Sequence, residues 1–568
     1  MKRESRATCS PIPNKEKHKA DMSKKNKYRS FAQFPEMHTV KEIVLYGAEH
    51  GKDKKQYMFE NFDGEVETKT FGQVFHDVHG FGQMLYTRGL RGKKVAILSE
   101  NSYYWIGVYY AIITGKMTAI PLDPKLHAED LTELMMRSAC DAIVYSKSYE
   151  DAIAMMQADE NVRLTEYIRI EDFYTLVQEG HDALENGAED YLRDEVLPDD
   201  LAFIVYTSGT TGKSKGVMLS QNNVASDATA AVRVMTGGHA IGFLPLHHTF
   251  SWVGALFTGC LLTNWGYICT SIKDIQKDLR TYHPQNFSAV PLVVETIYDR
   301  IWKTAQKGGQ EEKLQKGLRI SRFLLSHGID VRRKLFRRII DNLGGNLEMI
   351  VCGGAYMDEK YERGMYDFGI QIVNGYGITE CSPAVTCNRL DNFRFGSVGL
   401  PLPCCEVTIH EPDEEGVGEI YVRGSNVMLG YYDEPEATAE AFDGDWFKTG
   451  DYGYMDADGF LYFRGRKKNL IILSNGKNVS PEELEDKLST IAYVKEVLVY
   501  EEDKRITAEF FLDTENVPDA ADHLHGDVDA LNSKLPSYKR ISRIKTRDEE
   551  FPKTTSLKII RNYDKRNP

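Results

Sequence analysis

The stretch FIVYTSGTTGKSKGVMLS, from Phe203 to Ser220, decides how the rest of the sequence is interpreted. It begins with a short apolar run, Phe203–Tyr206, that is typical of a buried strand. The next ten residues hold three glycines, two lysines and five hydroxyl side chains. Glycines let backbone N–H groups approach a ligand, hydroxyls add hydrogen-bond donors, and lysines add positive charge. The stretch therefore predicts a loop that holds phosphate oxygens directly after a strand.

Three other interpretations of this stretch can be weighed against a phosphate loop. A Walker A loop would need a glycine at the position of Thr207, so that motif is not matched. The segment Gly212–Gly216 matches the G-x-S-x-G nucleophile elbow, with Ser214 as the nucleophile, but that motif follows its strand directly and here a loop intervenes. A surface loop rich in turn-forming residues is the third alternative. The density of these residues directly after an apolar strand favours the phosphate loop.

Length, charge and cysteine content narrow the class of protein. A chain of 568 residues is expected to form two or more domains, and its net charge of −14 argues against general nucleic-acid binding. Residues 1–30 carry a net charge of +7 and are expected to form a basic disordered tail, with a tether to anionic lipid as the alternative and Met22 as an alternative native start. The nine cysteines include no C-x-x-C pair and no zinc-ligand spacing, which indicates a reducing cytoplasmic setting.

Segments of strand and helix character alternate over residues 36–200. Lys94–Ser99 and Thr118–Asp123 are predicted as buried strands, and Tyr104–Thr114 between them as an apolar helix. This alternation predicts parallel α/β layers. Further along, Glu419–Gly424 is predicted as an exposed-edge strand.

Four later motifs occur in a fixed order after the phosphate loop. They are VNGYGITE at Val373–Glu380, TGD at Thr449–Asp451, the basic segment Arg464–Lys468 and FPKTTSLKIIR at Phe551–Arg561. With the loop, they resemble the adenylate-forming (acyl-activating, AMP-binding) superfamily, and most of all its long-chain fatty acid–CoA ligases, from about residue 35 onward. The resemblance implies an α/β fold with an α+β C-terminal part. Residues 31–467 would form a large multi-layered domain of β-sheets and flanking helices, and residues 468–568 a small mobile domain, with the hinge at Lys468.

The resemblance also implies the residues of an ATP site. The phosphate contacts would come from Thr207, Ser208, Gly209, Thr210, Thr211, Gly212 and Lys215. Adenine and ribose would be bound by Gly353, Gly354, Ala355, Asn374, Gly375, Tyr376, Gly377, Asp451 and Arg466. Thr379 would meet the α-phosphate and Glu380 would bind Mg²⁺, which agrees with the preference of that ion for carboxylate and phosphate oxygens.

Two further residues are assigned catalytic positions by the resemblance. Lys558 matches the terminal catalytic lysine, although Leu557 stands where the family usually has glycine. His248, at the end of a strand predicted over residues 241–248, would lie beside the acyl substrate.

The C-terminal part supplies the expected path for CoA. The loop residues Gly476, Lys477 and Asn478 would border it, just before a helix that is predicted to begin at Ser480 with a capping box closed by Glu483.

Two segments have an open interpretation. Residues 249–272 contain no charged side chain and are long enough to span a membrane. Their polar residues and glycines instead favour a buried helix followed by a strand, which would form one wall of an apolar substrate tunnel. Residues 303–338 are rich in basic residues at helical spacing and are interpreted as solvated amphipathic helices, with a face that gathers lipid substrate as the alternative.

The implied function is that of an ATP-dependent acyl-CoA synthetase. It would activate a medium- to long-chain fatty acid as acyl-AMP, release pyrophosphate and transfer the acyl group to CoA, with ATP, Mg²⁺ and CoA as cofactors and co-substrates. The alternatives are an aryl- or short-chain acid ligase, an enzyme that loads a carrier protein, and a non-catalytic nucleotide-binding protein. The expected partners are small molecules, and nucleic acid is not expected. The expected location is the cytoplasm. Peripheral contact with a membrane and formation of a homodimer are both left open.

Overall fold

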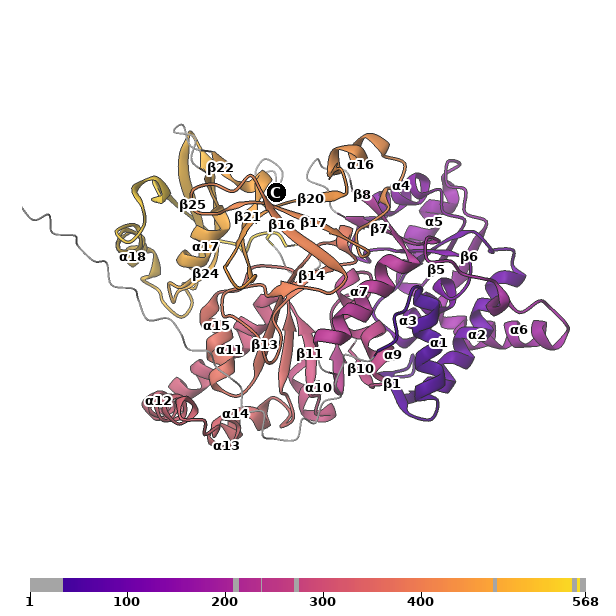
Figure 1. Cartoon of the computed structure of the whole chain (residues 1–568), viewed down its shortest axis with the longest axis horizontal. Helices are drawn as coiled ribbons and strands as arrows, with labels where there is room; N and C mark the ends of the chain where they lie inside the picture. Colours follow the sequence, from indigo (N-terminus) through magenta and orange to yellow (C-terminus); the bar gives the residue numbers. More distant parts are fainter. Residues whose placement is uncertain are drawn as a thin grey trace, which may run out of the picture.

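The computed structural model describes residues 34–207, 214–235, 237–269, 275–472, 478–553 and 559–561. Figure 1 shows a large N-terminal part, built of sheets and helices, and a smaller C-terminal part that lies against one side of it. This arrangement confirms the predicted fold class.

The first sheet holds the strand that precedes the phosphate loop. Its strand order is β18-β8-β7-β4-β3-β5-β6, and the pairs from β7 to β6 are parallel, as the alternating sequence pattern predicted. Strand β8 returns antiparallel to β7, so Thr207 and Lys215 face each other across the gap of the loop. The strands are β3 (Lys94–Leu98), β4 (Thr118–Pro121), β5 (Ala142–Tyr145), β6 (Glu166–Arg169), β7 (Leu201–Thr207), β8 (Lys215–Ser220) and β18 (Gly430–Tyr431).

The second sheet has the strand order β15-β14-β13-β12-β11-β9-β10-β1-β2. The strand predicted over 241–248 covers only the first part of that segment, because Pro245 offers no N–H and the chain turns there, with the His248 N–H donating to the Pro245 carbonyl. The strands are β1 (Lys55–Glu60), β2 (Val66–Thr70), β9 (Ala240–Gly242), β10 (Gly266–Ile268), β11 (Asn286–Ala289), β12 (Met349–Cys352), β13 (Gln371–Gly377), β14 (Ala384–Cys387) and β15 (Leu400–Pro401).

Helices fill the space between the two sheets. Helix α3 (Tyr103–Ile113) is buried along its whole length, which explains its lack of a polar face. The uncharged segment forms α8 (Thr249–Ser251), a π-helix (Trp252–Phe257), α9 (Thr258–Leu262) and then β10, as predicted. Within the described ranges, no helix combines the length and the apolar character needed to cross a membrane. The other helices of this layer are α1 (Val40–Gly51), α2 (Phe71–Thr87) and α7 (Gln221–Val234).

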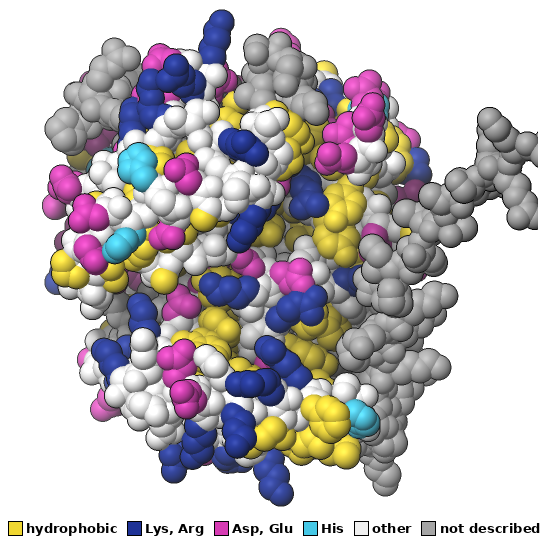
Figure 2. Space-filling view, turned by 90° about the vertical axis from the view of Figure 1, so that its left-hand side faces the viewer, with side chains coloured by type: hydrophobic (Ala, Val, Ile, Leu, Met, Phe, Trp, Pro, Cys, Tyr) yellow, Lys and Arg dark blue, Asp and Glu magenta, His cyan; other side chains and the backbone are white. Residues whose placement is uncertain are grey.

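The remaining helices of the N-terminal part lie on its outside. The predicted basic helices over 303–338 are α11 to α14, and Figure 2 shows Lys and Arg side chains gathered in the lower half of the face that carries them. The outer helices are α4 (Ala128–Ser138), α5 (Glu150–Ala158), α6 (Phe173–Glu185), α10 (Ile275–Tyr282), α11 (Pro291–Lys307), α12 (Glu311–Ser326), α13 (Arg332–Leu335), α14 (Arg337–Asn342) and α15 (Glu359–Asp367).

A third sheet, antiparallel, connects the two parts of the chain. The prediction of an exposed-edge strand at 419–424 is wrong: β17 lies between β16 and β20, and Ile420 and Val422 are fully buried. Glu419, the polar residue at the start of this strand, is also buried, because its carboxylate pairs with Lys467. The elements are β16 (Cys405–His410), β17 (Gly418–Gly424), α16 (Pro435–Ala441), β19 (Phe442–Asp443), β20 (Trp446–Met455) and β21 (Leu461–Arg466).

The C-terminal part has a hydrophobic core of its own, centred on Leu484, Val499 and Phe510. Ser480 caps α17 as predicted, but the second half of the predicted capping box is wrong, because the Glu483 carboxylate binds Lys487 and Lys539 instead of the Ser480 N–H. The elements are β22 (Ile471–Ile472), β23 (Asn478–Val479), α17 (Pro481–Ser489), β24 (Val494–Glu502), β25 (Arg505–Leu512), α18 (Ala520–Asn532) and β26 (Arg543–Arg547).

Candidate active site

A group of polar side chains gathers where β13, β20 and β21 end. The hydroxyl of Tyr376 donates a hydrogen bond of 2.8 Å to Oδ2 of the buried Asp451. Arg466 pairs directly with Asp451 across the β20–β21 ladder, and its Nε lies 3.3 Å from Asp451 Oδ1. Three residues that are up to 90 positions apart in sequence are therefore in one contact group.

Glu380 adds a second carboxylate to this group. It lies in the short 3₁₀ turn Thr379–Cys381 that follows β13, and it accepts a 3.0 Å hydrogen bond from the hydroxyl of Tyr431. Burial raises the pKa of the Glu380 carboxyl, while the nearby charge of Arg466 acts in the opposite direction. The ammonium of Lys215 lies 4.7 Å from the centre of the Tyr431 ring, so the far end of the phosphate loop reaches the same place.

Tyr431 has no role in the sequence interpretation, although it joins Glu380 to Lys215. It lies on β18, which pairs with β8 next to the phosphate loop. A single tyrosine between a glycine and a second tyrosine carries no chemical signature, so no signal in the sequence separates it from an ordinary buried ring.

The glycine turn and Asn374 lie at the edge formed by β12 and β13, which are parallel neighbours. A Cβ on Gly353 would lie 3.2 Å from the Gly375 carbonyl, so only glycine fits there without displacing the neighbouring strand. Asn374 is buried, with its amide nitrogen 3.3 Å from the Ser397 carbonyl, and its Oδ1 has no hydrogen-bond partner among the described residues. The glycine at 354 has a φ of +86°, a backbone conformation that favours glycine.

The two histidines of the PLHH segment lie together. The His247 and His248 rings are 4.3 Å apart at their centres, and His247 Nε2 is 3.7 Å from an Asp123 carboxylate oxygen. Burial lowers the pKa of His247, so the imidazole is neutral at physiological pH. His248, the predicted substrate neighbour, is the last residue before α8.

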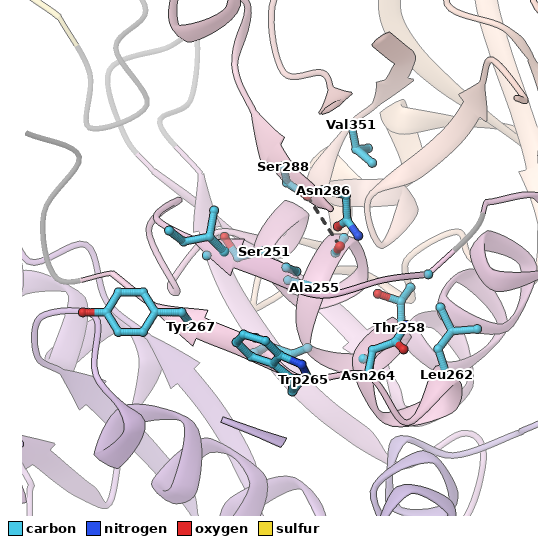
Figure 3. Close-up of a pocket in the computed structure, with 18 of the residues that line it drawn as sticks. Ser251, Ala255, Thr258, Leu262, Asn264, Trp265, Tyr267, Asn286, Ser288 and Val351 are labelled. Carbon is cyan, nitrogen blue, oxygen red and sulfur yellow. Dashed lines mark hydrogen bonds between the residues drawn. The ribbon is translucent and has the colours of Figure 1, made fainter. Parts of the chain in front are cut away.

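A cavity of about 90 Å³ lies beneath the uncharged helical segment. Figure 3 shows Ser251, Ala255 and Thr258 on its helical side, opposite residues of β10, β11 and β12. Among the described residues that line it, none has a charged side chain. Its lining extends from Leu244, Leu246 and Ser251 to Met235, Gly237, Asn264, Trp265 and Met349.

The cavity begins close to the glycine turn. A Cβ on Gly353 would lie 3.9 Å from the Phe250 ring, and a Cβ on Gly254 would lie 3.3 Å from the same ring. Gly254 is in the π-helix, a rare form that is frequent at functional sites, and its carbonyl is 3.5 Å from the Ser288 hydroxyl on β11. The cavity is therefore narrow between Gly254 and Ser288.

Lys468, the predicted hinge, lies in a 3₁₀ turn directly after β21. Burial and the charge of Arg466 lower the pKa of its ammonium. The next residue, Asn469, donates a 2.7 Å hydrogen bond to Glu482 on α17, which joins the turn to the C-terminal part.

Several predicted residues lie outside the described residues, and the structure says nothing of their placement. They are the phosphate-loop residues Ser208, Gly209, Thr210, Thr211 and Gly212, the loop residues Gly476 and Lys477, the side chain of Asn478, the catalytic Lys558 and the basic tail 1–30.

No group of three or more His, Cys, Asp and Glu side chains within the described residues has the arrangement of a protein metal site. The buried carboxylate of Glu380 fits Mg²⁺ that takes most of its ligands from nucleotide phosphates and water.

Comparison with known proteins identifies the family. The model of a family described as "AMP-binding enzyme" matches residues 46–432, and the model described as "AMP-binding enzyme C-terminal domain" matches residues 468–565. The chain belongs to the AMP-binding enzyme family, which confirms the family that its motifs indicated.

The sequence identity between this chain and individual relatives is low. The chain is 28% identical to the long-chain-fatty-acid–CoA ligase FadD15 of Mycobacterium bovis, over 79% of this chain and 78% of that protein. The crystal structure of the anthranilate CoA ligase AuaEII with anthranoyl-AMP has a TM-score of 0.75 at 20% identity, covering 94% of this chain and 97% of that one. A fatty acyl CoA synthetase from Mycobacterium tuberculosis has a TM-score of 0.65 at 20% identity, covering 92% and 97%. The two structures share the fold.

Proposed function

We propose that the protein is an ATP-dependent acyl-CoA synthetase whose acid is a medium- or long-chain fatty acid. The observation that carries the proposal is the uncharged cavity, which begins beside the glycine turn and extends beneath the π-helix. An alkyl chain gains by leaving water for such a cavity, while its carboxylate has to stay near polar groups. The relation to long-chain ligases, at 28% identity, supports the same acid class.

The polar cluster would hold the nucleotide. Asp451 has lone pairs beyond the one that Tyr376 uses, so its carboxylate can accept hydrogen bonds from the two ribose hydroxyls. The Tyr376 ring would stack on adenine, with Asn374 and Gly375 beside the base. Arg466, opposite Asp451, would contact ribose and phosphate.

The triphosphate would lie between the phosphate loop and the turn after β13. Lys215 and the loop residues before it would bind the phosphates that leave as pyrophosphate, and Thr379 would meet the α-phosphate. Glu380 would hold Mg²⁺, which when bound neutralises charge on the phosphates.

In the first step, an oxygen of the acid attacks the α-phosphorus and the bond to pyrophosphate breaks, leaving acyl-AMP. The carboxylate is itself the nucleophile, so the protein contributes position and charge stabilisation and no covalent intermediate. His248 would lie beside the acyl group at the mouth of the cavity, and Lys558 would stabilise the charge shared by carboxylate and phosphate.

In the second step, the CoA sulfur attacks the acyl carbonyl and AMP leaves. For this step the C-terminal domain, residues 468–568, would turn about Lys468 relative to residues 31–467, a hinge motion that withdraws Lys558 and brings Gly476, Lys477 and Asn478 to the thiol path. A separate C-terminal core and a turn at 467–469 support this division.

Mass spectrometry of the products tests the proposal. Purified protein is incubated with ATP, Mg²⁺ and a panel of acids from acetate to oleate with benzoate and anthranilate, with and without CoA. Long-chain acyl-CoA together with AMP and pyrophosphate is expected. If only aryl or short-chain acids gave CoA thioesters, the substrate would belong to that class of acid and would not be a long-chain fatty acid. Acyl-AMP that is not transferred to CoA would indicate that a carrier protein accepts the acyl group. No ATP consumption with any acid would indicate a non-catalytic nucleotide-binding protein.

A further inference from the structure

The outer face of α12 exposes apolar side chains where a solvated helix would show polar ones. Ile320 is 47% exposed and Phe323 is 63% exposed. Lys316 lies on the same face of the helix, one turn before Ile320 and two turns before Phe323. Leu318, on the opposite side of the helix, is buried in the core. The inner face of α12 therefore packs against the core of the protein, whereas the apolar residues on its outer face are available for contact with a partner.

The exposed apolar area extends past α12. Ile329, in the loop that follows, is 53% exposed, and Leu335, at the end of α13, is 47% exposed. A Cβ on Gly317 would lie 3.8 Å from Leu335 Cδ2, so Leu335 adjoins α12. We call Ile320, Phe323, Ile329 and Leu335, together with the cations described next, the α12 surface.

Cations are frequent in the segment that carries these apolar side chains. Residues 303–338 hold eleven Lys and Arg against three Asp and Glu, a net charge of +8, in a chain whose total is −14. Several of the arginines are occupied: Arg322 pairs with Asp367, and Arg337 with Asp341. No ion pair with the described part of the chain is found for Lys313, Lys316, Arg319, Lys334 and Arg338.

We propose that the α12 surface docks the protein on an anionic lipid bilayer. Exposed phenylalanine and aliphatic side chains gain by entering the boundary between headgroups and acyl chains, and lysine and arginine beside them gain from the negative surface potential. Figure 2 shows hydrophobic and basic side chains together in the lower half of this face. The apolar share of the surface distinguishes it from a nucleic-acid site. The chain as a whole has a net charge of −14, so this basic face would be drawn toward an anionic bilayer while the acidic parts of the chain would be repelled from it.

Docking of this kind does not depend on the proposed activity, but it would suit it. Long-chain fatty acids partition into bilayers, so an enzyme held there by electrostatic and shallow apolar contacts meets its acid without waiting for release into water.

Vesicle flotation with the full chain tests the proposal. Binding is measured on vesicles of phosphatidylcholine alone and with phosphatidylserine added, at low and high salt. Binding to the anionic vesicles that weakens with salt is expected. Lys316→Gln with Arg319→Gln removes two cations and is expected to weaken binding about 30-fold, at about 1 kcal/mol for each. Ile320→Ser with Phe323→Ser is expected to weaken binding even at low salt.

Matched controls separate this surface from the other basic parts of the chain. Lys147→Gln with Lys534→Gln removes two exposed cations elsewhere and is expected to leave binding unchanged. Removal of residues 1–33 tests the basic tail. Unchanged binding in both α12 variants, or loss of binding only when the tail is removed, would overturn the proposal, as would preference for RNA over vesicles. Thermal melting of each variant shows whether it is folded.

Discussion

Substitution of Gly254 by leucine tests whether the cavity holds the acyl chain. A Cβ at this position would lie 3.0 Å from the Ser288 hydroxyl, so a leucine side chain has to occupy the cavity at its narrow point. Ser288 and Asn286 both line the cavity and are two residues apart on β11, which is about 7 Å along a strand. The leucine side chain would therefore exclude the acyl chain from at least the part of the cavity between Ser288 and Asn286.

The expected loss follows from the excluded methylenes. An extended alkyl chain advances ~1.3 Å per carbon, so about five methylenes are excluded over this length. At about 0.8 kcal/mol for each methylene, the loss in transition-state stabilisation is about 4 kcal/mol, which lowers kcat/KM about 1,000-fold for a long acid. An acid that ends before Gly254 loses nothing.

The assay is kcat/KM for acyl-CoA formation across even-numbered acids from butanoate to stearate. Gly254→Leu is expected to give a stepwise loss that begins at one chain length. Gly526→Leu serves as the matched control, because a Cβ at Gly526 meets no atom within 4 Å. An equal loss for all acids, or no loss for the longest, would refute the assignment of this cavity to the acyl chain.

Three further predictions concern the nucleotide, the lysine and pH. Asp451→Asn is expected to raise the KM for ATP about 10- to 100-fold, since each hydrogen bond to a charged group contributes about 1.5–3 kcal/mol; an unchanged KM would remove Asp451 from the ribose site. Lys558→Ala is expected to abolish acyl-AMP formation while thioester formation from added acyl-AMP persists, and equal loss of both would contradict the division of roles. Burial beside Asp299 raises the pKa of Glu295 to about 7, so its contribution to stability is present below its unfolded pKa and is lost as pH rises through 7; Glu295→Gln is expected to raise Tm at pH 8 and leave it unchanged at pH 4, and parallel Tm curves would oppose this.

The candidate nucleotide-binding residues could be predicted because each lies in a short motif of glycine, hydroxyl and charged residues. Motifs such as TGD and YGITE are local in sequence, so the resemblance assigns Asp451 and Glu380 without knowledge of the fold. The structure adds their distances, including the 2.8 Å bond between Tyr376 and Asp451.

Other features depend on tertiary contacts that no local pattern encodes. Tyr431 reaches Glu380 from 51 residues away, and the narrow point of the cavity joins a π-helix to a strand 34 residues later. The alternation of residues 419–424 resembles a half-exposed strand, but pairing with Lys467 allows the polar Glu419 to be buried. Sequence predicts the type of these elements and leaves their partners open.

Transfer of ¹⁸O from the acid tests the central claim most directly, because it reports which bond forms. Palmitate labelled in both carboxylate oxygens is incubated with the protein, ATP, Mg²⁺ and CoA, and the nucleotide product is analysed by mass spectrometry. Attack of the carboxylate on the α-phosphorus predicts AMP that carries one ¹⁸O, with unlabelled pyrophosphate. Unlabelled AMP, or ADP with labelled phosphate, would contradict the formation of an acyl-adenylate.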